Sequence, residues 1–246
     1  MKLNSELTKL FDPQWYIYFY ENLTNDIKTQ KEIDFLLKHI PPGFSGYILD
    51  LACGYGRHSN LLSSLGYKVI GLDIMFGFLK RARENSNKFP FYIQGDMREL
   101  PFGDKSFSTV LFLFTSFGLL SEEENLSVIK EVIRVLKPKG VFCLDILNRD
   151  SFIKYYLPCM VVEREDNFMI DFPSFEPKSG FVKTRRIMIK GEERKETTFY
   201  LRLYNLTEVN SLLKSSGMEI KEVYGNWDGE IFSPFSRRMI IFAQKN

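Results

Sequence analysis

The chain has 246 residues, 44% of them apolar and 26% charged, which is typical of one globular domain and not of a disordered or fibrous protein. Lysine and arginine number 33 against 31 aspartate and glutamate residues, so the net charge of +2 does not indicate a nucleic-acid or anionic-membrane partner. The three cysteines lack metal-ligand spacing, and no stretch resembles a signal peptide or a membrane-spanning helix, so we expect a cytoplasmic protein with reduced thiols and no membrane partner.

The first predicted elements are helices near the start of the chain. Residues 14–40 carry apolar side chains at helical spacing, most clearly from Ile33 to Ile40, which indicates one or two helices. The run Pro41-Pro42-Gly43 should end this helical region, because proline cannot continue a helix.

Strand and helix patterns then alternate. A capping box of Ser121 and Glu124 predicts the start of one helix, and Lys137-Pro138-Lys139-Gly140 predicts its end. The alternation indicates a parallel sheet with helices on both faces. The predicted strands are 47–51, 67–72, 91–93, 109–114 and 141–147, and the predicted helices between them are about 57–65, 75–82 and 121–136.

The pattern changes after Asn148. Alternating residues around 199–204 and 181–189, separated by a Gly191-Glu192 turn, predict an inserted antiparallel hairpin or small sheet. Asn205 and Glu208 should cap a last helix ending at Gly217, and strands at 220–224 and 238–243 follow. We therefore expect a single domain over 1–246, made of an N-terminal helical lid (1–42), a nucleoside-binding core (43–147), a substrate lid (148–204) and a closing helix with two strands (205–246).

The turn after the first strand is the predicted ligand site. In an open parallel sheet, ligands bind beyond the carboxyl ends of the strands. The turn reads Leu49-Asp50-Leu51-Ala52-Cys53-Gly54-Tyr55-Gly56-Arg57-His58. Its small residues Ala52, Gly54 and Gly56 would let a ligand approach the backbone, and glycine tolerates positive φ.

Two acidic residues follow the next two predicted strands. Asp73 ends the second strand, 17 residues beyond Gly56, where a carboxylate can accept both hydroxyl hydrogens of a ribose. Asp96 follows the third strand and could accept a hydrogen bond from an adenine amino group. Other readings are open for both residues: Asp73 as a helix N-cap and Asp96 as a loop carboxylate.

Residues 46–147 resemble the class I S-adenosylmethionine-dependent methyltransferases. The first motif of that family is matched by Asp50, Ala52, Gly54 and Gly56, with Ala52 where glycine is usual. Asp73 matches the family's ribose-binding acid, and Asp96 with Met97 matches its adenine-edge pair. Residues 134–140 match the turn before the fifth strand. The resemblance implies a Rossmann-like α/β fold with seven strands in the order 3-2-1-4-5-7-6, the last antiparallel.

The same resemblance implies the chemistry. The methyl donor is S-adenosyl-L-methionine, the product is S-adenosyl-L-homocysteine, and no metal is demanded. The expected cofactor-binding residues are Asp50, Ala52, Cys53, Gly54, Gly56, Arg57, Asp73, Ile74, Asp96, Met97 and Phe114.

Two other functions compete with methyl transfer. An NAD-dependent oxidoreductase is disfavoured because Ser59 stands where the dinucleotide fingerprint requires glycine, and Arg57 and His58 add bulk near the pyrophosphate. A non-catalytic module that only holds the donor is the second, and a closed pocket without room for an acceptor would favour it.

The acceptor is expected to be a small molecule, and no catalytic residue is assigned. Polar aromatic residues that could line its pocket are Tyr16, Tyr20, Tyr204 and Trp227, with His58 as a further candidate. The stretch 178–195 contains seven basic and two acidic residues, so a nucleic-acid or protein acceptor stays open beside the simpler reading of a solvated hairpin edge.

Overall fold

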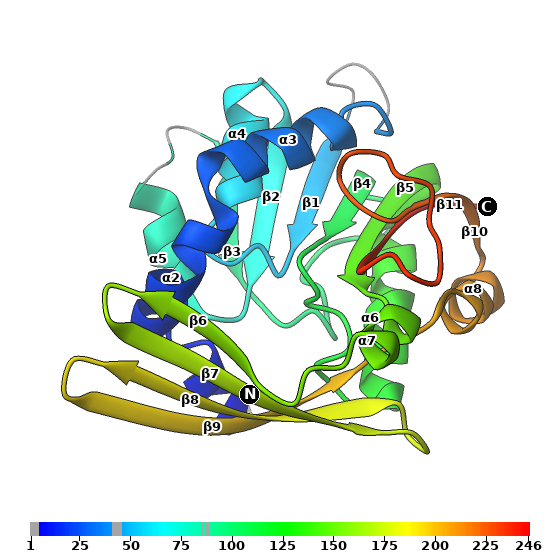
Figure 1. Ribbon diagram of the computed structural model, residues 1–246. Coiled ribbons are helices and arrows are strands. Elements are labelled where there is room, and N and C mark those ends of the chain that lie inside the picture. Colours follow the sequence, from blue (N-terminus) through cyan, green and yellow to red (C-terminus); the bar gives the residue numbers. More distant parts are fainter. Residues whose placement is uncertain (1–4, 41–45, 85, 87–88) are drawn as a thin grey trace.

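The computed structural model describes residues 5–40, 46–84, 86 and 89–246. Within these residues, seven strands form a central sheet in the order β3-β2-β1-β4-β5-β11-β10, and β11 runs antiparallel to both its neighbours (Figure 1). This order confirms the one implied by the family resemblance. The strands are β1 (Tyr47–Leu51), β2 (Lys68–Asp73), β3 (Phe91–Gln94), β4 (Phe107–Phe112), β5 (Leu136–Leu147), β10 (Met218–Tyr224) and β11 (Arg238–Lys245).

Helices cover both faces of this sheet, as expected. On one face, α3 (Asp26–Leu36) and α4 (Arg57–Ser64) bury Ile33, Leu36 and Leu62 against the strands. On the other, α6 (Glu122–Val135) and α8 (Leu206–Ser215) pack their apolar sides on the sheet. Strand β4 lies between these layers and is almost wholly buried, which explains its continuous apolar sequence. Helix α5 (Phe76–Glu84) follows β2.

The N-terminal region forms several short helices. These are α1 (Ser5–Leu10), α2 (Pro13–Tyr20) and the 3-10 helix η1 (Glu21–Thr24). Asp12 starts α2 by accepting hydrogen bonds from the backbone of its first turn, and Asn25 does the same for α3. These caps divide the predicted helical region 14–40. The predicted stop at Pro41-Pro42-Gly43 lies outside the described residues.

The insert is a four-stranded antiparallel sheet in the order β6-β7-β8-β9. Its strands are β6 (Met160–Arg164), β7 (Asn167–Glu176), β8 (Phe181–Lys190) and β9 (Glu193–Arg202), and α7 (Arg149–Lys154) precedes them. The hairpin of β8 and β9 confirms the predicted one, and Gly191 supplies the positive φ of 57° in its turn. Strands β6 and β7 were not predicted, because buried residues do not alternate regularly along them.

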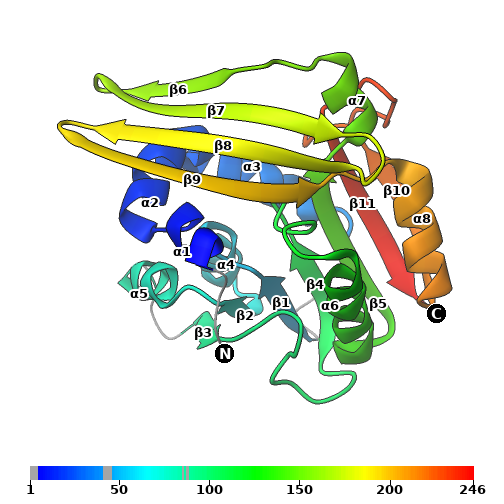
Figure 2. The ribbon, with the colours of Figure 1, turned by 90° about the horizontal axis from the view of Figure 1, so that it is seen from below.

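The insert sheet lies beyond the carboxyl ends of the parallel strands (Figures 1 and 2). Helices α1 and α2 lie on the same side of the core, and α1 contacts β9. The N-terminal helices and the insert therefore meet above the edge where an α/β sheet binds ligands. No helix in the described part of the chain combines the length and apolar character needed to cross a membrane.

Two of the predicted boundaries that differ from the structure have a clear physical cause. Strand β4 ends at Phe112 and not at Phe114, because the chain turns sharply at Phe114 and Thr115, with φ of 58° and 62°. Strand β5 already begins at Leu136, which pairs with Phe107, whereas Val141 pairs with Thr109. The predicted turn 137–140 is present between these two pairs, with Lys139 at a positive φ of 61°, but it interrupts the pairing inside β5 and does not precede the strand.

Candidate active site

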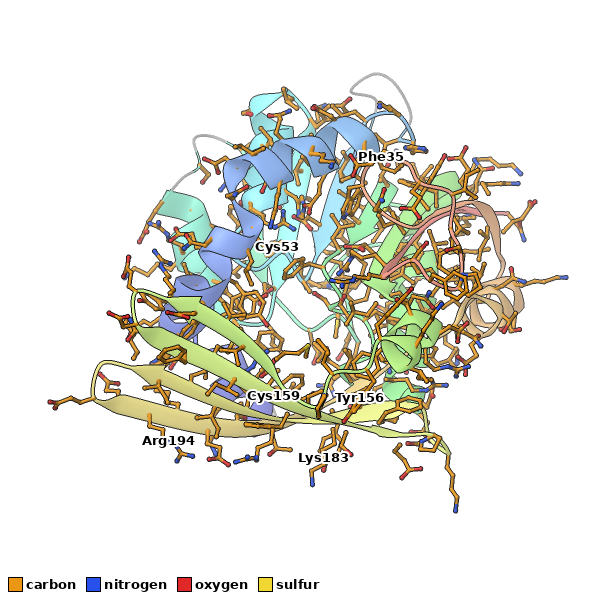
Figure 3. The ribbon with its side chains drawn as sticks, in the orientation of Figure 1. Phe35, Cys53, Tyr156, Cys159, Lys183 and Arg194 are labelled. Atoms are coloured by element: carbon orange, nitrogen blue, oxygen red, sulfur yellow. The ribbon has the colours of Figure 1, made fainter. Side chains whose placement is uncertain are left out.

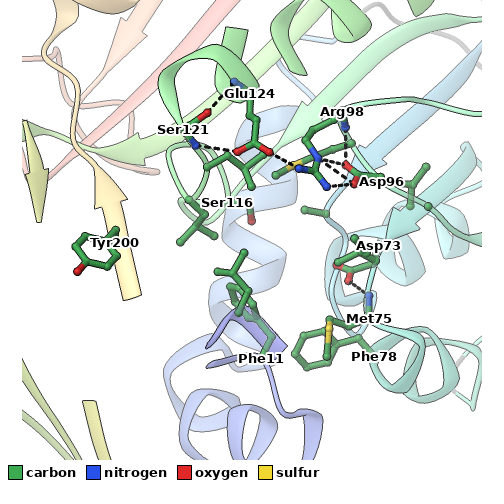
Figure 4. Close-up of a pocket in the computed structure, with 18 of the residues that line it drawn as sticks. Phe11, Asp73, Met75, Phe78, Asp96, Arg98, Ser116, Ser121, Glu124 and Tyr200 are labelled. Atoms are coloured by element: carbon green, nitrogen blue, oxygen red, sulfur yellow. Dashed lines mark hydrogen bonds and ion pairs between the residues drawn. The ribbon is translucent and has the colours of Figure 1, made fainter. Parts of the chain in front are cut away.

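A cavity of about 530 Å³ opens where the core, the N-terminal helices and the insert meet (Figure 4). It lies beside the ends of neighbouring strands: Ala52 follows β1, Asp73 ends β2, and Asp96 follows β3. This volume is within the usual range for small-molecule sites, roughly 300–1,000 Å³. The lining residues are Leu7, Phe11, Tyr16, Ala52, Leu72, Asp73, Ile74, Met75, Phe78, Gly95, Asp96, Met97, Arg98, Ser116, Leu119, Leu120, Ser121, Glu124, Phe181 and Tyr200.

A second cavity of about 60 Å³ adjoins the first. The two share Tyr16, Ala52 and Ser116, so these three residues mark the junction between them. The smaller cavity is lined by Tyr16, Thr24, Asp50, Ala52, Cys53, Tyr55, Arg57, His58, Leu113, Phe114 and Ser116.

The two cavities bring together nine of the eleven expected cofactor-binding residues. The larger cavity is lined by Ala52, Asp73, Ile74, Asp96 and Met97. The smaller cavity is lined by Asp50, Cys53, Arg57 and Phe114, and Ala52 lines this one too. Gly54 and Gly56 belong to the same first turn but line neither cavity.

The Asp73 carboxylate ties the first turn to the start of α5. One oxygen accepts from the backbone N–H of Met75 at 2.8 Å, and the other accepts from that of Gly54 at 2.9 Å. Burial raises the pKa of Asp73 to about 6, although these backbone hydrogen bonds oppose the shift. Met75 precedes α5 (Phe76–Glu84), so this bond fixes the turn before the helix and Asp73 is not its N-cap residue; each oxygen keeps a further lone pair for a ligand.

Asp96 is held by Arg98. Its carboxylate accepts from the Arg98 backbone N–H at 2.8 Å and from the guanidinium at 2.6–3.1 Å. Burial opposes ionisation, but these hydrogen bonds outweigh it and lower the pKa of Asp96. Arg98 also pairs with Glu124 at the start of α6. The three side chains form one charged wall of the larger cavity (Figure 4).

The first turn is fixed by buried contacts. The Ser59 hydroxyl donates to Asp50 at 2.5 Å, so both side chains hold α4 against β1. At Gly56, φ is 79°, and an added Cβ would lie 2.2 Å from the Tyr92 hydroxyl oxygen. At Gly54, φ is 56° and an added Cβ would meet nothing within 4 Å. The expectation that Gly56 makes room for a ligand is therefore corrected: it makes room for Tyr92.

Glu32 on α3 links the N-terminal region to the first turn. Its carboxylate pairs with Arg57 and lies 2.6 Å from Nε2 of His58. Burial would raise the pKa of Glu32, but the hydrogen bonds and charges of His58 and Arg57 outweigh it and lower the value to about 2. No pattern in the sequence pointed to Glu32.

The loop after β4 is held in an unusual conformation. The buried carboxylate of Asp145 accepts from the backbone N–H of Phe114 at 3.0 Å and from Arg238 at 2.5 Å. The Arg57 guanidinium lies 5.3 Å from the centre of the Phe114 ring. Arg238, which had no role in the sequence analysis, therefore supports the wall of the smaller cavity.

Comparisons with known proteins agree with this geometry. A family model described as a methyltransferase domain matches residues 48–140, which include the first turn, Asp73 and Asp96. An uncharacterised methyltransferase of Synechocystis is 33% identical over 153 residues, covering 58% of this chain and 70% of that protein. The chain belongs to the class I S-adenosylmethionine-dependent methyltransferases.

Two further similarities cover most of this methyltransferase. The putative methyltransferase YqeM of Bacillus subtilis is 27% identical over 209 residues, which cover 82% of this chain and 85% of that protein. The structure of the CcbJ methyltransferase from Streptomyces caelestis shares the fold, with a TM-score of 0.79, 20% identity, and coverage of 94% of this chain and 98% of that one.

The aromatic candidates for the acceptor pocket of the methyltransferase fall into two groups. Tyr16 lines both cavities, and Tyr20 stacks on it with ring centres 4.3 Å apart. Tyr204 is buried in the core against Phe117, and Trp227 packs on α3 beside a separate surface groove. The structure thus places Tyr16 and Tyr20 at the site and the other two away from it. His58 lines the smaller cavity while bound to Glu32.

Several lining residues of the methyltransferase were missed by sequence reasoning. Arg98 lies two residues after Asp96, so its proximity was a usable signal. Glu124 was recognised only as part of a capping box, which the structure confirms. The others come from elements far apart in the chain and carried no local signal: Leu7, Phe11, Ser116, Leu119, Leu120 and Phe181.

Proposed function

We propose that the methyl donor binds across both cavities. The ribose faces Asp73, the adenine lies beside Asp96 and Met97, and the methionyl group enters the smaller cavity near Asp50, Arg57 and Phe114. The observation that carries this proposal is the meeting of the first turn, Asp73 and Asp96 at two adjoining cavities that share Tyr16, Ala52 and Ser116. Ile74 and Ala52 supply apolar walls, while Cys53, Gly54 and Gly56 shape the turn.

The residues present fit such a ligand. Asp73 keeps unused lone pairs beside the cavity, and Asp96 has the backbone of Met97 next to it. The junction of the cavities at Tyr16, Ala52 and Ser116 is where a group between nucleoside and amino acid would lie. S-adenosylmethionine supplies an activated methyl group that is displaced in line by a nucleophile.

The protein's contribution is then positioning. Holding two reactants at roughly 3–3.5 Å removes up to about 7–11 kcal/mol of the barrier. The Asp145–Arg238 pair fixes the loop at Phe114, and Glu32 fixes α3 against Arg57 and His58. We assign these residues to positioning. The N-terminal helices and the insert act as lids that exclude water from the site.

The acceptor we propose is a small molecule. The larger cavity extends past the donor residues to Phe181 and Tyr200 of the insert, so it leaves room for an acceptor and speaks against a non-catalytic binding module. CalS10 of Micromonospora echinaspora, which is 18% identical with a TM-score of 0.63, is an amino pentose methyltransferase. The three free cysteines suit a reducing compartment, and we place the reaction in the cytoplasm.

The donor site is tested with Asp73→Ala. Removing the carboxylate should weaken S-adenosylhomocysteine binding by about 1–3 kcal/mol, or roughly 5- to 150-fold, as measured by calorimetry. Asp228→Ala is the matched control, because Asp228 is an exposed carboxylate outside both cavities. Unchanged affinity in folded Asp73→Ala protein would remove Asp73 from the site.

The acceptor class is tested with a labelled-methyl assay on a fractionated cell extract. The label should appear in the small-molecule fraction. Label recovered only in nucleic acid or protein would overturn that part of the proposal.

A further inference from the structure

The side of the larger cavity away from the donor residues has an apolar lining. In Figure 4, Tyr200 stands across the pocket from Asp73 and Asp96. The residues on this acceptor side come from the N-terminal helices, the loop before α6 and the insert: Leu7, Phe11, Leu119, Leu120, Phe181 and Tyr200. None of these six side chains carries a charge, and Tyr200 is the only one that offers a hydrogen bond.

All charged residues among the described lining belong to the donor side. They are Asp73, Asp96, Glu124 and a single cation, Arg98. Arg98 is already paired with both Asp96 and Glu124. The cavity therefore holds an excess of negative charge and no unpaired cation to compensate an incoming anion, whose desolvation would be costly.

The basic stretch 178–195 does not supply that cation. Arg186 is buried and pairs with Asp171 at 2.7 Å, while Arg185 pairs with Glu196. Lys183 and Arg194 point away from the core (Figure 3). None of the basic residues of this stretch lines the larger cavity as the structure describes it. Arg186 also donates to the Tyr20 hydroxyl at 2.9 Å, but Tyr20 does not line the larger cavity either, so the positive charge that kept a nucleic-acid acceptor open lies outside that cavity.

We propose that the methyl acceptor is an uncharged, largely apolar small molecule, such as a hydroxyl- or amino-bearing aromatic compound. This inference rests on the proposed donor site. The ring or alkyl body packs on Phe11, Leu120 and Phe181, and the nucleophilic atom points toward the junction at Tyr16 and Ser116. Phosphorylated metabolites and nucleic acids are excluded by the same lining.

The transfer step balances without a further reactant. A lone pair on the acceptor atom forms the bond to the methyl carbon while the carbon–sulfur bond breaks and its electron pair stays on sulfur. A proton on the acceptor atom leaves to water. Burial and the neighbouring Tyr20 raise the pKa of Tyr16 well above its usual range, so its phenol is neutral near pH 7 and orients the acceptor as a hydrogen-bond partner.

The test compares two probes that share a phenol nucleophile, 4-butylphenol and 3-(4-hydroxyphenyl)propanoate. Binding of each to the protein saturated with S-adenosylhomocysteine is measured by ligand-observed NMR. The neutral probe should bind about tenfold or more tightly than the carboxylate, because the cavity offers no counter-charge. Equal binding, tighter binding of the carboxylate, or no binding of the neutral probe at millimolar concentration would overturn the inference.

A pair of variants locates the effect in the cavity. Tyr200→Arg adds a cation to the acceptor side and should bring the ratio of the two affinities close to one. Tyr155→Arg is the matched control, since Tyr155 is 50% exposed against 52% for Tyr200 and lies outside the cavity; its ratio should stay as in the original protein. An unchanged ratio in Tyr200→Arg would contradict the inference.

The two proposals fail separately. S-adenosylhomocysteine affinity is measured first, without probe. A protein that does not bind it refutes the donor site, whereas a protein that binds it but prefers the carboxylate refutes only the acceptor class.

Discussion

The chemistry of the site depends on carboxylates whose surroundings differ. Asp73 is buried with two backbone hydrogen bonds and, among the described residues, no cation paired with it, so its pKa rises to about 6. Asp96 is also buried but is surrounded by Arg98, so its pKa falls. The first therefore titrates near physiological pH and the second does not.

Donor binding should depend on pH through Asp73. The ionised carboxylate is the form that accepts from the ribose hydroxyls, so S-adenosylhomocysteine affinity should be constant above pH 7 and fall as the pH drops below about 6, by up to tenfold per unit. Calorimetry from pH 5 to 8 measures this. Asp73→Asn should bind weakly at every pH; a variant that keeps the same pH dependence would show that another group is responsible.

The two glycines of the first turn should respond differently to alanine. Gly56→Ala combines a positive φ with a clash against Tyr92, so the free energy of unfolding should fall by about 2–4 kcal/mol. Gly54→Ala introduces only backbone strain, so its free energy of unfolding should fall by about 1–2 kcal/mol. Denaturant unfolding of both variants gives the comparison. Equal losses would mean that the contact with Tyr92 does not constrain Gly56.

At the scale of elements, α3 is attached to the site by Glu32 and by Thr29, whose hydroxyl accepts from Arg57 at 3.1 Å. Glu32 reaches from α3 to Arg57 and His58 at the start of α4, next to the smaller cavity. Helix α3 thereby contributes both to the core, through Ile33 and Leu36, and to the position of the first turn. The hairpin β8–β9 has a similar double role, because its inner face packs on α2 and its edge reaches the larger cavity.

Glu32→Gln should destabilise the protein by about 1–3 kcal/mol at pH 7, because it leaves two buried partners without their anion. The pKa of Glu32 is lowered from 4.5 to about 2, so its contribution is present above pH 4.5 and is lost as the pH falls toward 2. The difference between the two proteins in unfolding free energy should shrink over that window.

Asp34→Asn on the exposed side of the same helix is the control and should change stability by less than about 0.5 kcal/mol. A loss as large as that of Glu32→Gln would point to a general effect of charge on α3.

At the scale of the molecule, the active site exists only where distant parts of the chain meet. The donor side is built from strand ends of one sheet, whereas the acceptor side combines residues near 7–16, 116–120 and 181–200. In the proposed assignment, acceptor specificity depends on the relative placement of core, N-terminal helices and insert, while donor binding depends mainly on the core.

Ligand-induced stabilisation separates the donor from a dinucleotide. S-adenosylhomocysteine at 100 times its dissociation constant should add about 2.7 kcal/mol of stability, or roughly 5–10 °C in melting temperature for a chain of this size. NAD should produce no shift, since Ser59, whose hydroxyl donates to Asp50, stands where the NAD fingerprint needs glycine. A larger shift with NAD than with S-adenosylhomocysteine would contradict the donor assignment.

The sequence by itself determined the features that depend on neighbouring residues. The capping boxes at Ser121 and Asn205, the strand of 47–51 and the turn at Gly191 follow from local hydrogen bonds and periodicity. The strand order was inferred from the family resemblance, because several motifs of that family occur along the chain in the family's order. Asp73 and Asp96 were found because each ends or follows a strand, and parallel strands end at the same edge.

Only the tertiary structure decided which side chains share a cavity. Tyr204 and Trp227 resemble Tyr16 in chemistry, but packing buries one in the core and places the other beside α3. The pairing of Glu32 with the first turn, and that of Arg98 with Glu124, arise from elements brought together by hydrophobic burial. Such contacts join residues far apart in the chain, and the local pattern around each residue contains no information about its partner.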